Sequence, residues 1–473
     1  MSRLMREDWI EVELGKLCAF SQGIQVSIKE QYSEENEERV RFLRIIDFTQ
    51  GNEPERYVKK IEGNHIVSKD DISMVRYGTV GFVCTGKAGA IANNLFRIIP
   101  NDGIQKKYLI HFLKSSVFRQ YLNAKGATMQ ALSFALINPI QIPLAPLPIQ
   151  RAIVSKIEAL FSDLDNGIAN FKKAQEQLKI YRQAVLKKAF EGKLSEPLIN
   201  NDLSDDTDFK SENEKSSKSF NHKNPSSDNL PKGWKWVNSG ELFSFVTSGS
   251  RGWAKYYSES GSIFIRITNL NFDTLNIDLR QEKIQYVNPP QNSEGSRTKV
   301  EEGDFLFSIT GYLGMFAIAP KLESAFVNQH VSLCRPKDFF DKKYLAYWII
   351  AKSGGHYFLN KNQKGAVKAG LNLDDLKNFP VPLPLSIEEQ KQIVQEIERR
   401  LSVCDKMEQS INESLKKAEA LRQSILKKAF EGKLLSQAEI ELCKKEADYE
   451  PASELLKKIT NEKLRITKKT AKK

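Results

Sequence analysis

The chain has 473 residues, 40% hydrophobic and 27% charged, so it is too long for one ordinary core and should fold as two to four domains. Its net charge of +12 suits a polyanionic partner, although many basic proteins never touch nucleic acid. The chain opens without a signal segment, and no apolar run approaches the ~18 residues of a membrane span. The five cysteines are scattered and lack CxxC spacing. Together these features predict a cytoplasmic protein with reduced thiols.

One segment of the sequence occurs twice. Residues 182–194 recur at 422–434, except that Ser424 replaces Ala184 and Ile425 replaces Val185. The offset of 240 (422 minus 182) holds without a gap back to Gln150 and Gln390. A repeat of this length is too long for a solenoid unit and indicates a duplicated half-protein.

Each half begins with a tryptophan, Trp9 in the first and Trp234 in the second, followed by short β-branched and aromatic runs. Glycine, asparagine and aspartate interrupt these runs, which predicts a strand-rich module at 1–149 and another at 231–389. Within the modules 41–48 matches 263–270, a glycine pair recurs (Gly78 and Gly81, Gly311 and Gly314), and short helices are expected at 108–113 and 344–350.

A proline cluster ends each module and a long helix is predicted after it, at 150–198 and at 390–436. About 45 residues of helix would span ~65 Å, more than one globular core needs. Apolar residues recur with heptad spacing, and polar breaks argue against a parallel zipper, so we expect the two helices of one chain to pair antiparallel. The predicted helix–helix or partner interface comprises Ile157, Leu164, Phe171, Leu178, Val185, Phe190, Ile397, Ile411, Leu421, Ile425 and Phe430.

Two segments are expected to pack little. Residues 199–230 are rich in Ser, Asn, Asp and Lys and predict a flexible linker. The C-terminal tail at 437–473 has apolar periodicity at 452–459 and then turns basic, with Lys463, Arg465, Lys468, Lys469, Lys472 and Lys473. We expect that tail to be frayed and solvated.

Signals for catalysis are incomplete. Residues 81–87 have the GxxxxGK spacing of a phosphate-binding loop, but Ala88 follows instead of Ser or Thr, and the repeat predicts a strand there. The Asn288-Pro289-Pro290 sequence resembles an amino-methyltransferase loop, but Gln291 lacks the aromatic ring that the loop needs, so a turn is expected. The five histidines have no metal spacing.

The repeated features together resemble the specificity subunit of type I restriction-modification enzymes. The resemblance rests on 143–153 and 382–393, on the two Phe-Glu-Gly-Lys-Leu ends, and on 450–456. It implies an α+β fold with two target recognition domains separated by an antiparallel coiled coil. The long polar linker departs from the family pattern.

The resemblance also implies a non-catalytic subunit that binds double-stranded DNA, two methyltransferase subunits and, in the restricting complex, motor-nuclease subunits. S-adenosylmethionine, ATP and Mg would then be bound by those partners, and this chain would hold no cofactor or metal. The alternative is a divergent DNA amino-methyltransferase that carries its own recognition domains.

Specific DNA reading requires Arg, Lys, Asn, Gln or Thr side chains at base edges and phosphates. The loops aligned by the repeat supply such residues, although each could instead be a solvated charge or hold the fold together. Arg44 and Arg266 lie between apolar neighbours, so structural salt bridges remain possible for them. The candidates are Arg44, Asp47, Arg76, Thr79, Lys125, Arg251, Lys255, Arg266, Asn269, Thr310, Tyr312, Lys364 and Lys368.

Overall fold

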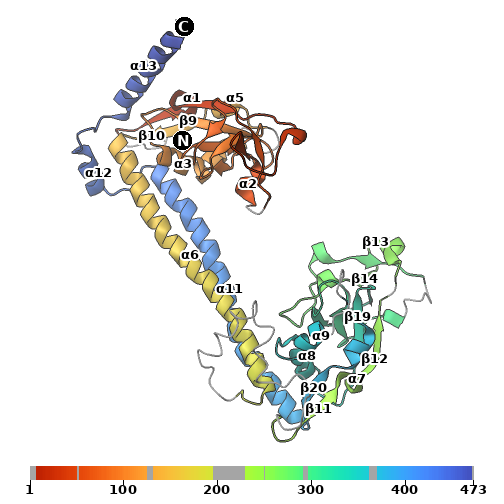
Figure 1. Ribbon diagram of the computed structural model, residues 1–473. Helices are drawn as coiled ribbons and strands as arrows, with labels where there is room; N and C mark the ends of the chain where they lie inside the picture. Colours follow the sequence, from red (N-terminus) through yellow and green to blue (C-terminus); the bar gives the residue numbers. More distant parts are fainter. Residues whose placement is uncertain are drawn as a thin grey trace. The chain divides into compact units, whose positions relative to one another are not determined.

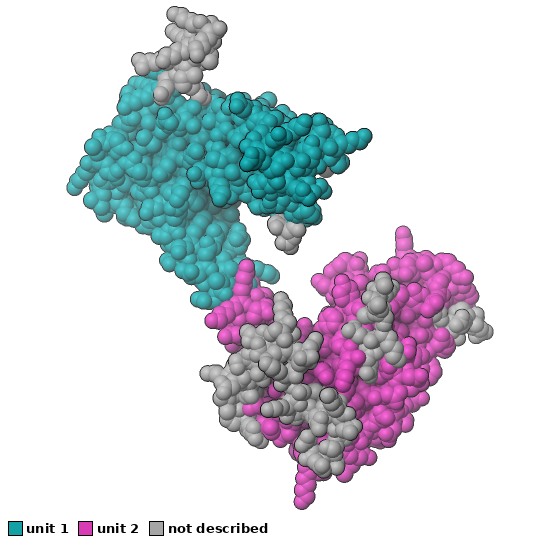
Figure 2. All heavy atoms as spheres, in the orientation of Figure 1, with its two compact units in different colours: residues 1–170, 413–473 teal, residues 171–412 magenta. Residues whose placement is uncertain are grey.

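The computed structural model describes residues 7–50, 53–124, 131–194, 230–249, 251–290, 297–361 and 370–470. The chain divides into two compact units, residues 1–170 with 413–473 and residues 171–412 (Figure 2). Each unit contains one strand-rich module and a part of each of the two long helices (Figure 1).

The module of the first unit is built from three small sheets. Strands β1 and β10 pair antiparallel, a second sheet has the order β2-β9-β6-β7, and a third has the order β4-β3-β8-β5 with β3 parallel to β8. Short helices lie between the strands in the sequence. The strands are β1 (Ile10–Glu13), β2 (Cys18–Gln22), β3 (Arg39–Leu43), β4 (Tyr57–Lys59), β5 (Ile66–Val67), β6 (Ile72–Val75), β7 (Val83–Cys84), β8 (Gly89–Ile91), β9 (Leu95–Pro100) and β10 (Gln141–Leu144). The helices are α1 (Leu14–Leu17), α2 (Ile45–Thr49), α3 (Lys106–Leu113), α4 (Ser116–Ala124) and α5 (Phe134–Ile137), with a 3-10 turn η1 (Ile28–Glu30).

The module of the second unit repeats this plan. Strand β11 pairs with β20, and the sheet β12-β19-β16-β17 has the same order as its counterpart. In the third sheet, β13-β15-β14-β18, the pair β14–β18 is again parallel. The strands are β11 (Trp234–Asn238), β12 (Phe243–Ser248), β13 (Tyr257–Ser258), β14 (Ser262–Ile265), β15 (Tyr286–Val287), β16 (Phe305–Ser308), β17 (Phe316–Ile318), β18 (Ala325–Val327), β19 (Val331–Pro336) and β20 (Pro380–Pro384). The helices are α7 (Ser239–Leu242), α8 (Lys342–Ile350), α9 (Gly355–Lys361) and α10 (Leu373–Lys377), with 3-10 turns η5 (Trp253–Tyr256), η6 (Ile267–Asn269) and η7 (Gln281–Lys283).

The two long helices, α6 (Leu147–Phe190) and α11 (Ile387–Phe430), run antiparallel in both units. In the second unit Gln175 of α6 donates to Asn412 of α11 at 2.9 Å, and Arg182 donates to Asp405 at 2.7 Å. The second contact lies seven residues later in α6 and seven residues earlier in α11. In the first unit Arg422 donates to Asp165. The predicted α+β fold with an antiparallel coiled coil is therefore confirmed.

Most residues of the predicted apolar stripe are buried or half-buried. Ile157, Val185 and Ile397 are fully buried, as expected for positions facing the partner helix or a module, and Leu164 and Phe171 are half-buried. Leu421 differs, because half of its side chain is exposed, so it does not lie between the helices.

Both helices end earlier than the positions 198 and 436 predicted from the sequence. Gly192 and Gly432 have φ of 70° and 72°, the left-handed conformation that stops a helix. The N–H of Lys193 donates to the carbonyl of Lys188 at 2.9 Å, and that of Lys433 to Lys428 at 2.8 Å. The duplicated Phe-Glu-Gly-Lys segment is thus a helix C-cap, used twice.

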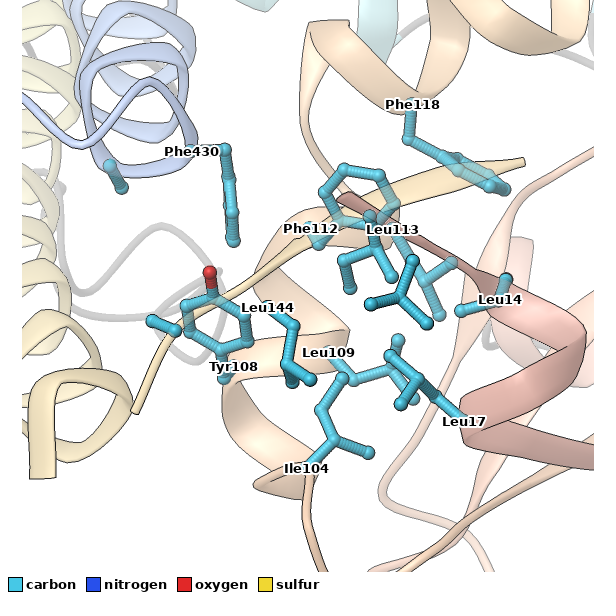
Figure 3. Close-up of a cluster of buried hydrophobic side chains, with 14 of the residues drawn as sticks. Leu14, Leu17, Ile104, Tyr108, Leu109, Phe112, Leu113, Phe118, Leu144 and Phe430 are labelled. Carbon is cyan, nitrogen blue, oxygen red and sulfur yellow. The ribbon is translucent and has the colours of Figure 1, made fainter. Parts of the chain in front are cut away.

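The phenylalanine of each cap lies inside a module core. Phe430, at the end of α11, packs edge-on against Tyr108 and Phe112 of the first module, with ring centroids 5.1 and 5.3 Å away (Figure 3). Phe190, at the end of α6, packs in the same way against Tyr344 and Trp348 of the second module, at 5.3 and 5.0 Å. Each helix end therefore completes the core of one module.

A buried glutamine joins the start of each long helix to its module. The Gln150 side chain donates to the carbonyl of Ala145 at 2.8 Å and accepts from the N–H of Gln105 at 2.9 Å. Gln390 does the same with the carbonyl of Pro384 and the N–H of Asp341, both at 2.8 Å. A buried amide with its hydrogen bonds satisfied holds the helix at a defined angle to the sheet.

The prediction of a frayed, solvated tail is wrong for residues 437–459. Helices α12 (Gln437–Lys444) and α13 (Ala452–Thr470) follow α11, and Ala452, Leu455 and Ile459 lie buried in the core of the first unit. The hydroxyl of Tyr449 donates to Asp8 at 2.8 Å, so the tail also meets the N-terminal part of the module. The apolar residues of 452–459 form a surface that packs against the core of the first unit. The predicted linker lies outside the described residues, apart from Leu230, which packs on the second core.

None of the helices that the structure describes is both long enough and apolar enough to span a membrane.

Candidate nucleic-acid interface

Several loops of the first module meet at one end of the sheet β2-β9-β6-β7. The antiparallel register places Gln22 at the end of β2 opposite Phe96, and Val75 at the end of β6 opposite Leu95. The loops that follow β2 and β6, and the turn that precedes β9, therefore lie at the same edge. The end of β3 joins them, because the N–H of Ala92 donates to the carbonyl of Leu43 at 2.9 Å.

The second module brings the corresponding segments together. Ser248 at the end of β12 lies opposite Ser332, and Ser308 at the end of β16 lies opposite Val331. The N–H of Asn328 donates to the carbonyl of Ile265 at 3.0 Å, which places the end of β14 beside the same turn. We call these two surfaces the loop edges. The first comprises 22–25, Arg44, 76–82 and 92–94, and the second comprises 248, 249, 251, 252, Arg266, 309–315 and 328–330.

Asp47 and Asn269 lie at matching positions and are buried. Asp47 accepts from the guanidinium of Arg41 at 2.7 Å and from Arg44 at 3.0 Å, and it also caps the backbone N–H of Arg44. Asn269 caps the N–H of Arg266 at 2.8 Å and donates to the carbonyl of Asp278 at 3.0 Å. The two residues are only 4% and 1% exposed, so both hold the fold together.

The two arginines beside them are half-buried, and each holds the loop that follows its strand. Arg44 donates to the carbonyl of Pro54 at 2.9 Å, and Arg266 donates to that of Lys283 at 3.1 Å. Each therefore has a structural role at the loop edge.

The β6–β7 and β16–β17 hairpins form the tips of the loop edges. Arg76 is half-buried, donates to the carbonyl of Leu132 at 3.1 Å and lies over the ring of Tyr77, whereas Thr79 is exposed. In the second module the hydroxyl of Thr310 lies 3.1 Å from Nδ1 of His330, and the side chain of Tyr312 is 72% exposed.

Arg251 belongs to the second loop edge, and Lys255 extends it. Both are exposed, and the ammonium of Lys255 lies 4.9 Å from the centre of the Tyr256 ring. Turn η5, which carries Lys255, is anchored by Trp253, whose ring stacks on that of Phe264 at 5.6 Å. Lys125, Lys364 and Lys368 lie outside the described residues.

Sequence reasoning did not select the polar turns that connect these loops. The Asn93 side chain donates to Gln25 at 3.4 Å, and Gln22 donates to the carbonyl of Asn93 at 3.5 Å. The matching turn contains Gln329, whose amide lies 3.0 Å from Nε2 of His330. A usable signal existed, since each turn has consecutive polar residues between two apolar runs, at 93–94 and at 328–330. Amide, hydroxyl and guanidinium groups of this kind can recognise base edges.

The weak catalytic signals have structural explanations. Residues 81–87 form a glycine turn and strand β7, as the repeat predicted, and strand β8 follows instead of a helix. Asn288 donates to the carbonyl of Ser260, 28 residues away, at 3.1 Å, and the described residues 288–290 show no turn, so the predicted turn is not seen there. Among the described residues no group of His, Cys, Asp and Glu is arranged to hold a metal ion.

A protein-family model matches both halves of the chain. The model of the type I restriction modification DNA specificity domain matches residues 6–173 and again 231–417. The chain is 24% identical over 467 residues to the type I restriction enzyme EcoBI specificity subunit of Escherichia coli, covering 97% of this chain and 93% of that protein. It is 26% identical to the EcoKI specificity subunit of Escherichia coli K12, covering 77% of this chain and 73% of that protein.

A solved structure that concerns complex assembly and conformational transition of the type I R-M system contains a chain of similar fold. It matches with a TM-score of 0.63 at 20% identity, over 91% of this chain and 99% of that chain. Because the family model matches both halves, including both modules, the chain belongs to the type I restriction modification DNA specificity domain family.

Proposed function

We propose that this chain is the specificity subunit of a type I restriction-modification system, in which each module reads one half of a bipartite DNA site. The main support is that the two loop edges are built from matching strands but present different side chains. Thr79 and Asn93 in the first correspond to Tyr312 and Gln329 in the second. Identical edges would suit a palindrome, whereas different edges suit two different half-sites.

The basic residues of the loop edges support contacts with DNA phosphates. Arg251 is exposed within the second loop edge, Lys255 is exposed beside it, and Arg76 lies in the first loop edge. Lys125, Lys364 and Lys368 stay candidates on their sequence position alone. Asp47 and Asn269 are left out of the proposed contacts, because their polar atoms are buried and bonded within the module.

The helix pair is proposed to set the separation of the two half-sites and to bind two methyltransferase subunits. Three large apolar side chains of α11 support a protein partner, since Val403, Met407 and Leu421 are each about half exposed. Burying such residues at an interface is favourable by roughly 25 cal/mol per Å². In this proposal the chain itself is non-catalytic and acts in the cytoplasm. S-adenosylmethionine, ATP and Mg belong to the methyltransferase and motor-nuclease subunits.

Exchange of one module tests the proposal. Residues 1–149 would be replaced by the corresponding module of a relative, and the chain would be produced together with its methyltransferase subunits. Sequencing of methylated sites should then show one half of the motif changed and the other half unchanged. A change in both halves, or the absence of any bipartite motif with the unaltered chain, would contradict independent reading by two modules.

A further inference from the structure

Tyr312 is the most exposed of the large aromatic side chains in the part of the chain that the structure describes. Its exposed fraction is 72%, compared with 45% for Tyr257 and 48% for Tyr77. A single exposed aromatic is common on protein surfaces. This one is distinguished by its position, because it stands at the tip of the β16–β17 hairpin, within the loop edge of the second module.

The backbone under Tyr312 is held tightly. The buried hydroxyl of Ser308 donates to the carbonyl of Tyr312 and accepts from the N–H of Met315 at 3.0 Å. Gly311 and Gly314, with φ of 78° and 84°, make the turn on either side. A ring on such a tip loses little backbone freedom when it contacts a ligand, so more of the contact energy contributes to binding.

Two other segments of the second module contact the hairpin. A Cβ atom at Gly314 would lie 2.9 Å from the ring of His356 in α9, which shows how closely that helix approaches. The N–H of Leu371 donates to the carbonyl of Ile309 at 3.0 Å. These contacts hold the hairpin and leave Tyr312 exposed at its tip.

The surroundings of the tip are suited to nucleic acid. Thr310, Gln329 and His330 form a hydrogen-bonded polar group next to it, and none of these side chains carries the negative charge that would repel phosphate. Among the described residues no other ring and no cation covers the face of Tyr312. An exposed aromatic among groups that can bind base edges is able to stack on a base, an interaction that every base can make.

From this geometry we infer that Tyr312 stacks on a base of the second half-site and unstacks it from its neighbour. The inference rests on the proposed function, because it requires the second module to read DNA. The hairpin tip would act as a wedge of the kind that side chains form when they enter a base step. The first module is expected to act differently, since the guanidinium of Arg76 lies 5.4 Å from the centre of the Tyr77 ring.

The test uses the full chain assembled with its methyltransferase subunits, and duplexes that carry the motif methylated by the unaltered complex. 2-Aminopurine would replace the bases of the second half-site one at a time. Tyr312→Ala and Tyr312→Phe would be compared with Tyr257→Ala, a matched control from the same module that lies outside the loop edge. Thermal unfolding would check that each variant is folded.

We expect Tyr312→Ala to weaken specific binding at least tenfold while binding to unrelated DNA changes less than twofold. Tyr312→Phe and Tyr257→Ala should stay within threefold of the unaltered chain. One 2-aminopurine position should change in fluorescence on binding, and that change should be lost with Tyr312→Ala. Loss of binding in the phenylalanine variant to the same extent would assign the effect to the hydroxyl and overturn the inference.

Two further results would also overturn it. These are binding by Tyr312→Ala within twofold of the unaltered chain, and a fluorescence response that persists in that variant. Failure of the proposed function has a separate signature, because the unaltered complex would then methylate no bipartite motif.

Discussion

The ring of Phe190 lies 5.0 Å from that of Trp348, edge to face, and neither side chain is exposed. Phe190 belongs to the helix that follows the first module in the sequence, whereas Trp348 belongs to the second module. The same relation recurs between Phe430 and Phe112 of the first module, at 5.3 Å. The core of each module thus contains a residue supplied by the other half of the duplicated chain.

Phe190→Ala is expected to destabilise the second unit by about 3–5 kcal/mol, because it removes a fully buried ring and leaves a cavity. Denaturant unfolding and hydrogen exchange would measure the loss, which should be concentrated in residues 230–412. Leu421→Ala is the control, since its side chain is half exposed and should cost less than about 1 kcal/mol in the isolated chain. Equal effects of the two variants would contradict the packing role of Phe190.

Gly192→Ala should destabilise the chain by about 2 kcal/mol or more. The left-handed φ of 70° is strained for alanine, and its Cβ would lie 2.5 Å from Cγ of Pro231. Gly167→Ala, within α6, is the matched control, because no atom lies within 4 Å of the new Cβ. That variant should stabilise the helix by roughly 0.5–1 kcal/mol. If both variants changed the free energy of unfolding in the same direction, the role of Gly192 as a left-handed helix cap would be disproved.

The docking of α12 should depend on pH. Hydrogen bonds from Lys156 and from Ser436 lower the pKa of the Glu439 carboxyl from 4.5 to about 2. Because the folded pKa is the lower one, the stabilisation is complete above about pH 4.5 and is lost as the pH falls towards 2. Hydrogen exchange of residues 437–459 should therefore accelerate over this range. Glu439→Gln should show weaker protection at pH 7 and less pH dependence. An unchanged pH profile in that variant would assign the effect to another carboxyl group.

Insertion of four residues after Ala174 in α6 should lengthen the gap between the two half-sites. Four residues add about 6 Å of helix, or one to two base pairs at roughly 3.4 Å each. Because four residues are close to one helical turn, the apolar stripe should be disturbed less than by an insertion of two. Sequencing of methylated sites would read the gap. An active variant that keeps the original gap would show that the helices only bind partners and do not set the spacing.

Local features of the sequence were sufficient for much of the architecture. The duplication defined two modules, and heptad spacing after the proline clusters located two long helices to within a few residues at their starts. Such features depend on residues that are close together in the sequence, and the spacing of apolar residues among them indicates a helix or a strand directly. The helix ends were misplaced because the glycines at 192 and 432 were read as part of a repeated motif and not as left-handed caps.

Tertiary structure decided the rest. Only the strand register brings Gln22, Arg76 and Asn93 to one loop edge, although they are far apart in the chain. Only packing distinguishes Asp47, which is buried between two arginines, from Thr79, which is exposed, although both were equally plausible contacts for DNA. The docking of the C-terminal helices likewise depends on a distant apolar surface. Contacts between distant segments are set by the free energy of the whole packed core, and the pattern of any one segment does not specify them.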